Sequence, residues 1–130
     1  MLTRSVFVFL AGMPVFQRYD AKGALLFERV MQGRELDPVV TDMPKTWPRR
    51  SVDGKELPVV VPTVRAAAAD RVGNLWVSFL IPSTYVFDAS GEKIDTVQFR
   101  AAGMLTPTSL FFNNQGRLLV TPGCFQFDVN

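Results

Sequence analysis

Residues Val64–Arg100 read VRAAAADRVGNLWVSFLIPSTYVFDASGEKIDTVQFR and contain short apolar runs separated by turn residues. Gly73 and Asn74 follow the first run, and both residue types tolerate the positive φ angles of hairpin turns. Pro82 ends the second run, because proline has no backbone N–H to donate to a neighbouring strand. We therefore predict four antiparallel strands that form one unit: Val64–Ala69, Leu75–Ile81, Tyr85–Phe87 and Ile94–Arg100.

Two signatures of this segment recur along the chain. An aromatic residue followed by Asp-Ala-x-Gly occurs at 19–23 and at 87–91, and Phe127-Asp128 opens a third copy. A polar turn ending in glycine, then one residue and an apolar strand, occurs at 70–77 and at 113–120. The second signature repeats after 43 residues, and Asp88 and Asp128 are 40 residues apart. A period of about forty residues is typical of propeller blades.

The segment 34–62 interrupts the repeat. It holds five prolines and little strand periodicity, so we predict a long excursion between two blades. The remaining chain divides into an incomplete first blade (1–33), a complete middle blade (63–103) and an incomplete last blade (104–130). Their further strands are predicted at Val6–Leu10, Val15–Tyr19, Ala24–Val30, Ser109–Phe112, Arg117–Thr121 and Phe125–Val129. The predicted fold is all-β, a partial β-propeller of four-stranded antiparallel blades with a long Pro-rich insertion.

A compact β-sandwich is the alternative architecture. The hairpin spacing fits a sandwich of about ten strands as well, but a sandwich does not account for the repeat of about forty residues. The nearly continuous apolar run Leu75–Ile81 favours a sheet covered on both faces, which is what stacked blades require. We therefore favour the propeller.

These motifs resemble a known family. The order Asp-x-x-Gly-Asn-Leu-Trp-Val, aromatic-Asp-Ala-x-Gly-x-x-Ile and Gly-x-x-x-Pro (Gly103–Pro107) is similar to the NHL-type repeats of bacterial six-bladed β-propellers. The resemblance covers nearly all residues outside 34–62. It implies a role shared with binding modules, scaffolds, lactonase-like hydrolases or a lyase. Six blades would need about 240 residues at this period, so a second copy of the chain is one expected way to complete the propeller.

The composition excludes several kinds of chemistry. Fourteen basic and twelve acidic residues give a net charge of +2, too small to indicate a nucleic-acid partner or an anionic membrane. Without histidine, Ser-His-Asp or Cys-His catalysis and imidazole-ligated metals are excluded. Cys124 is the single cysteine, and we expect it to be packed and inert beside Phe125. We predict no catalytic residue, no cofactor and no metal site.

A candidate face for a ligand or partner follows from the propeller architecture, in which inter-blade loops emerge together. We assign to it Trp47, Arg49, Arg50, Asp42, Glu35 and Tyr85. Trp47 beside two arginines combines an amphipathic anchor with bidentate donors, as at protein interfaces and carboxylate or phosphate sites. In the alternative interpretation, Trp47 plugs an apolar rim and the arginines pair with Glu35, Asp37 or Asp42.

The repeated acids Asp20, Asp70, Asp88 and Asp128 have a structural explanation. Each opens a turn, and its carboxylate can accept hydrogen bonds from the backbone N–H groups of that turn. We therefore predict turn capping for these residues instead of catalysis.

Three functional hypotheses remain. The leading one is a non-enzymatic propeller module or fragment that binds a protein or peptide, or assembles with itself through open strand edges. The second is part of a lactonase-like or lyase-like propeller enzyme, and the third is a gene fragment without independent function. The run SVFVFLAGMPVF at 5–16 fits a signal sequence or a buried strand. Export is slightly favoured over a cytoplasmic location, and no run reaches the ~20 apolar residues of a membrane span.

Overall fold

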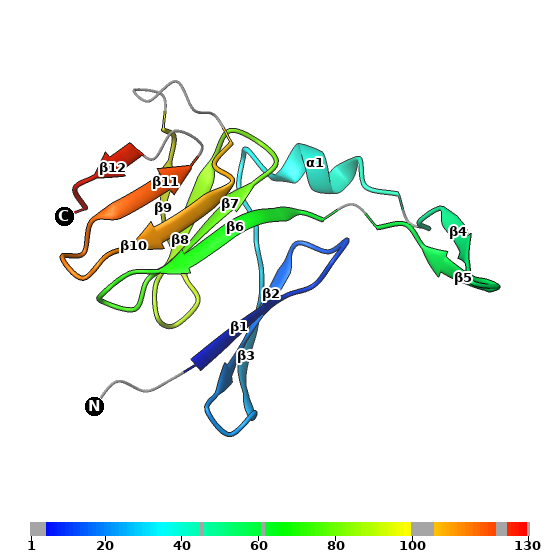
Figure 1. The fold of residues 1–130 in the computed structure, drawn as a ribbon, viewed down its shortest axis with the longest axis horizontal. Helices are drawn as coiled ribbons and strands as arrows, with labels where there is room; N and C mark the ends of the chain where they lie inside the picture. The colour runs from blue at the N-terminus through cyan, green and yellow to red at the C-terminus, as the bar shows by residue number, and fades with distance from the viewer. Residues whose placement is uncertain (1–4, 45, 61, 100–105, 122–124, 130) are drawn as a thin grey trace. The chain divides into compact units, whose positions relative to one another are not determined.

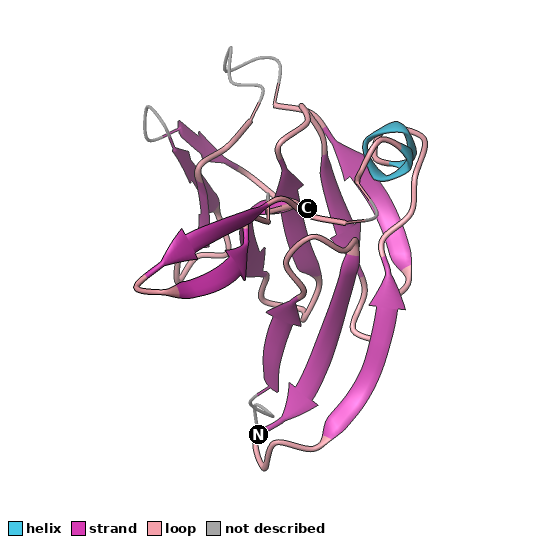
Figure 2. Cartoon of the chain, turned by 90° about the vertical axis from the view of Figure 1, so that its right-hand side faces the viewer, coloured by secondary structure: helices cyan, strands magenta, loops and turns pink. Residues whose placement is uncertain are grey.

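The computed structural model describes residues 5–44, 46–60, 62–99, 106–121 and 125–129. Within them the chain forms small antiparallel sheets and a short helix (Figures 1 and 2). Contacts divide the chain into two compact units, 1–63 and 64–130. In every sheet the strands that pair are neighbours in sequence. The all-β prediction is therefore confirmed.

The second unit begins with the predicted four-stranded sheet. Its strands are β6 (Val64–Ala69), β7 (Leu75–Phe79), β8 (Thr84–Phe87) and β9 (Lys93–Val97), paired in that order (Figure 1). Every residue of β7 and β8 is buried, as expected for central strands covered on both faces. The prediction was too long for the last strand, because the pairing with β8 ends at Val97. Arg100 lies outside the described residues.

A three-stranded sheet follows in the same unit. It consists of β10 (Ser109–Phe112), β11 (Leu118–Thr121) and β12 (Phe125–Phe127). Side chains from both sheets of the unit form one apolar core: Trp76, Val86, Phe99, Leu110, Leu118 and Val120. Truncating a buried side chain of this size to alanine typically costs about 2–5 kcal/mol. This core fixes the β10–β12 sheet against the face of the β6–β9 sheet that carries Trp76.

Four hairpin turns share one geometry, at residues 20–24, 70–74, 88–92 and 113–117. In each, the first residue pairs with the fifth through a backbone hydrogen bond, and the fourth residue is a glycine whose φ lies between 76° and 91°. A three-residue loop with glycine in the left-handed region is a common hairpin connection. An Asp side chain caps three of the turns, and Asn113 replaces it in the fourth. The predicted repeat thus corresponds to a repeated turn.

The first unit contains the sheet of β1 (Ser5–Phe9), β2 (Val15–Asp20) and β3 (Leu25–Val30). Phe16 is fully buried, and its ring packs against Phe7, Phe9 and Phe27 at centroid distances of 6.0–6.3 Å. Three aromatic contacts around one ring explain why this short meander is ordered, since such pairs add about 0.5–1.5 kcal/mol each beyond area burial.

The Pro-rich segment contains regular structure that was not predicted for it. It forms the helix α1 (Asp37–Thr41) and the hairpin of β4 (Arg49–Val52) and β5 (Lys55–Pro58). Asp53 and Gly54 connect the two strands, with φ angles of 51° and 77°, as a two-residue type I′ turn requires. The Asp-Gly pair was the sequence signal for this hairpin. Twelve strands are therefore described where ten were predicted.

Candidate partner-binding surfaces

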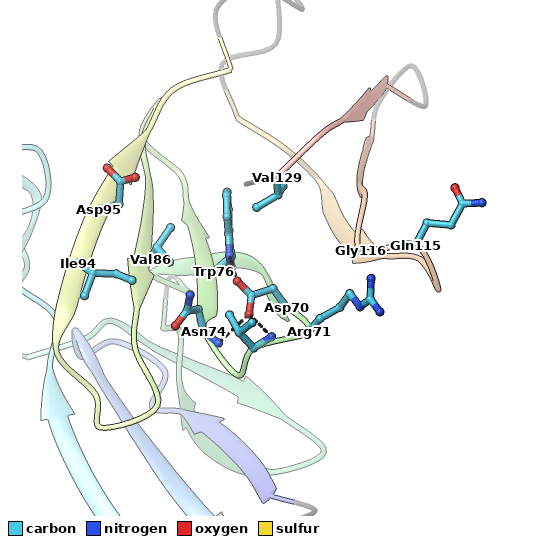
Figure 3. Close-up of a pocket in the computed structure, with 11 residues that line it drawn as sticks. Asp70, Arg71, Asn74, Trp76, Val86, Ile94, Asp95, Gln115, Gly116 and Val129 are labelled. Carbon is cyan, nitrogen blue, oxygen red and sulfur yellow. Dashed lines mark hydrogen bonds between the residues drawn. The ribbon is translucent and has the colours of Figure 1, made fainter. Parts of the chain in front are cut away.

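The second unit contains an open groove of about 560 Å³. We call it the Trp76 groove; its lining includes Asp70, Arg71, Trp76, Val86, Ile94, Asp95 and Val129 (Figure 3). A second recess of about 340 Å³ adjoins it and shares Trp76, Asp95 and Val129. Figure 3 shows the indole of Trp76 between Val86 and Val129. The groove therefore has an aromatic floor and apolar walls.

The turn between β6 and β7 positions Trp76. The Nε1–H of its indole donates to Asp70 Oδ2 at 3.1 Å, while Oδ1 of Asp70 accepts the backbone N–H groups of Val72 and Asn74 at 3.1 and 2.8 Å. The indole also meets Phe112 edge to face, at 5.5 Å between ring centroids. Asp70 thus has both a capping role and a second role, in which it orients the groove floor.

Acidic groups outnumber basic groups around the groove. Asp70 and Asp95 line the main recess, Asp128 joins Asp95 in the adjoining one, and Arg71 is the single cation among the lining residues of both. Asp128 forms an ion pair with Arg117, with 3.2 Å between Asp128 Oδ1 and Arg117 Nε. Asp95 is exposed, and the backbone N–H of Thr96 donates to its Oδ1. The lining of the groove therefore combines apolar surface with an excess of carboxylates.

A strand edge borders the adjoining recess, which Phe127 helps to line. Among the described residues, β12 pairs with β11 alone, so one side of its backbone is open. Phe125 on this strand is 40% exposed. An open edge offers backbone N–H and C=O groups that can pair with a further strand.

The residues of the predicted face come from several elements in two units. Arg49 and Arg50 are exposed on β4, Asp42 is the exposed C-cap of α1, and Glu35 is half-buried just before that helix. Tyr85 belongs to the other unit; its side chain has no exposed surface and packs against Phe79 and Phe87, with Lys93 Nζ 3.8 Å from the ring centroid. Tyr85 is therefore unavailable to a surface ligand, because β8 is a central, buried strand.

Trp47 is half-buried in the loop before β4. A Cβ placed on Gly12 would lie 3.0 Å from Trp47 Nε1 and 2.6 Å from a methyl group of Val60. The indole therefore packs closely over the backbone of the β1–β2 turn, because Gly12 has no Cβ. The φ of Gly12 is 76°, a conformation that also favours glycine. This contact agrees with the alternative interpretation, in which Trp47 plugs an apolar rim.

The predicted acid partners of the arginines are wrong for Arg49. Its Nε lies 3.6 Å from Glu56 Oε2 on the neighbouring strand, and its Nη2 donates to the Glu56 carbonyl. Asp37 instead accepts the backbone N–H of Gly33 at 3.0 Å. The physical reason is the hairpin, which places Ser51 opposite Glu56 and Arg49 one step away on the same face.

The β4–β5 hairpin has two chemically distinct faces, and all eight of its strand residues are exposed. Alternation along paired strands places Arg49, Ser51, Glu56 and Pro58 on one face and Arg50, Val52, Lys55 and Leu57 on the other. The first face contains the Arg49–Glu56 ion pair. The second, which we call the basic face of the hairpin, has two cations, two apolar side chains and no acid.

The capping prediction is confirmed for Asp20, Asp70 and Asp88. At Asp88 the hydroxyl of Ser90 and the backbone N–H groups of Glu92 and Ser90 donate to Oδ1, and these hydrogen bonds hold the pKa of the carboxyl below its ordinary value. Asp128 pairs with Arg117 instead. Cys124, expected to be packed and inert, lies outside the described residues.

Two kinds of site are absent from the described part of the chain. No group of three or more His, Cys, Asp or Glu side chains there could hold a metal ion. None of its helices is both long enough and apolar enough to cross a membrane.

Sequence reasoning missed the Trp76 groove. Asp70, Trp76 and Asp95 come from different strands and turns, and the sequence assigned Asp70 to a turn and the aromatic residues to the core. The six-residue spacing from Asp70 to Trp76 was the available signal, because the aspartate-turn-strand order of a hairpin brings those two side chains together.

Comparison with known proteins does not add an identification. The chain matches no protein-family model, and no curated protein is significantly similar to it.

Proposed function

We propose that this chain is a non-enzymatic β-propeller module that binds a protein or peptide, including a second copy of itself, in the manner of the NHL-type repeats that its sequence resembles. The observation that carries the proposal is the Trp76 groove beside the open edge of β12. A strand added to that edge gains backbone hydrogen bonds, and its alternate side chains gain an apolar recess.

The architecture supports the propeller part of the proposal. The β6–β9 sheet is a four-stranded antiparallel meander whose two central strands are buried throughout. The turn at 70–74 recurs 43 residues later as the first turn of the next meander. Blades that repeat in this way are stabilised by stacking on their neighbours, so an exposed blade face favours association.

The chemistry of the groove supports binding of a macromolecular segment. Trp76 is only 8% exposed at the floor, whereas Ile94 on the wall is 54% exposed. An open groove with exposed apolar walls and acidic residues around it fits an extended segment better than an enclosed small molecule.

Light scattering coupled to size exclusion, over a wide concentration series, tests assembly; selection from a library of extended peptides tests heterologous binding. We expect a dimer or a selected peptide, with slowed amide exchange in 125–127. Ile94→Glu should weaken either interaction by about tenfold, since it places a charge in an apolar recess. Leu26→Glu, at a comparably exposed residue of β3, is the matched control. A chain that stays monomeric and selects no peptide would refute the proposal.

A further inference from the structure

We infer that the occupant of the Trp76 groove is the β4–β5 hairpin of a second copy of this chain, inserted by its basic face. This inference rests on the proposed function and specifies the partner of the same groove. Two observations in separate parts of the chain lead to it: a hairpin that is exposed on both faces and a groove that is open and acidic.

The hairpin has the properties of a segment that needs a partner. A two-stranded ribbon is at best marginally stable in water without a surface to pack on. In this one Val52 is 42% exposed and Leu57 is 48% exposed, and both lie on the basic face with Arg50 and Lys55. Covering this face would bury two apolar side chains and bring two cations to the partner.

The groove offers the matching chemistry. Its apolar surface comes from Trp76, Ile94 and Val129, which can receive Val52 and Leu57 of the hairpin. Asp95 is exposed and lines both recesses, so it is the carboxylate best placed for Lys55 or Arg50. Charges of opposite sign on the two surfaces guide association and fix its register.

The opposite face of the hairpin does not suit the groove, because it offers neither a free cation nor a large apolar side chain. Arg49 there is already paired with Glu56, Nε to Oε2 at 3.6 Å, and Ser51 and Pro58 offer little apolar area. If each chain gives its hairpin to the groove of the other, the contact is used twice and closes a two-fold dimer, with no surface left for further copies to add in the same way.

Charge reversal in two variants tests the inference. Lys55→Glu brings a second carboxylate to Asp95, and Asp95→Lys brings a second ammonium group to Lys55. Each variant alone should self-associate at least about tenfold more weakly than the original chain, because like charges are brought together. The two variants mixed should recover the original affinity, since in the mixed dimer position 55 of each hairpin faces a position 95 of opposite charge.

Lys22→Glu and Glu92→Lys are the matched controls. They make the same changes of charge at exposed residues outside the hairpin and the groove, and they should leave self-association within about threefold of the original. All four substitutions are at exposed residues, so far-UV circular dichroism should show unchanged folding.

The outcomes separate this inference from the proposed function. Weakening in both variants with recovery on mixing would support the exchanged hairpin. Unchanged self-association in both variants would overturn the inference. The proposed function would then remain, with another surface making the contact between the copies. A chain that is monomeric at every concentration would overturn the inference too, and peptide selection would then decide the proposed function alone.

Discussion

Asp70 should be the one turn aspartate that asparagine cannot replace. Its Oδ1 accepts two backbone N–H groups, as in the other turns, but its Oδ2 also accepts the indole N–H of Trp76 at 3.1 Å. In Asp70→Asn the amide oxygen would keep the turn, so the amide NH₂ would face the indole N–H, donor against donor. Trp76 is only 8% exposed, so water can replace the lost acceptor only in part.

We expect Asp70→Asn to lower the free energy of unfolding by about 2 kcal/mol, within the 1.5–3 kcal/mol typical of a hydrogen bond to a charged group. Asp20→Asn is the control, because Asp20 caps its turn through Oδ1 and Asn113 shows that asparagine suits this turn; its cost should stay below about 0.5 kcal/mol. Urea unfolding followed by tryptophan fluorescence in a Trp47→Phe background reports on Trp76 alone.

A double-mutant cycle decides whether the indole is the cause. With Trp76→Phe the N–H is gone, so adding Asp70→Asn should then cost about as little as Asp20→Asn, and the coupling energy should be about 1–2 kcal/mol. Far-UV circular dichroism follows unfolding in the chains without tryptophan. Equal costs for the two asparagine variants, or a coupling energy near zero, would refute the role assigned to Asp70.

Two further predictions concern the same family of turns. Gly116→Ala should lower the free energy of unfolding more than Gly23→Ala does. Both residues have positive φ, where an added Cβ costs about 1–2 kcal/mol. A Cβ at Gly116 would also lie 2.5 Å from Arg71 Cδ, whereas nothing lies within 4 Å of a Cβ at Gly23. Arg71→Ala should remove the excess in urea unfolding; an excess that persists would contradict the contact. The lowered pKa of Asp88 stabilises the fold above the unfolded-state pKa of about 4, and this contribution should vanish as pH falls through the folded-state pKa. In an NMR titration, Ser90→Ala should raise that pKa; an unchanged pKa would show that the hydroxyl is not its main cause.

The strands of the fold could be predicted because their signals are local. All ten predicted strands are present, and the longest errors are at ends such as Ile94–Arg100, where pairing stops at Val97. Proline content hid the β4–β5 hairpin, although Asp53 and Gly54 carried its turn signal. Pro58 is tolerated there because β5 is an edge strand in a two-stranded ribbon.

The candidate site was harder to predict because it depends on contacts between distant segments. Arg49 pairs across a hairpin with Glu56, a partner that only the strand register identifies. Tyr85 opens a predicted strand next to the loop at Pro82, yet burial of every residue of β8 removes it from the surface. Composition indicated which residue types could form a binding surface, but only the fold determines which of those residues are exposed together.

The repeated turn links the fold to the groove. In three copies the capping side chain, Asp20, Asp88 or Asn113, serves its own loop. In the fourth, the free oxygen of Asp70 holds an indole that belongs to the adjacent strand. Asp70 is therefore the copy in which the capping residue also holds a side chain outside its own turn. By that argument the groove should tolerate exchange of the whole 70–74 turn for the 113–117 turn only if position 70 keeps its aspartate. The exchange that leaves asparagine at position 70 should lose binding at the groove while its core stays folded.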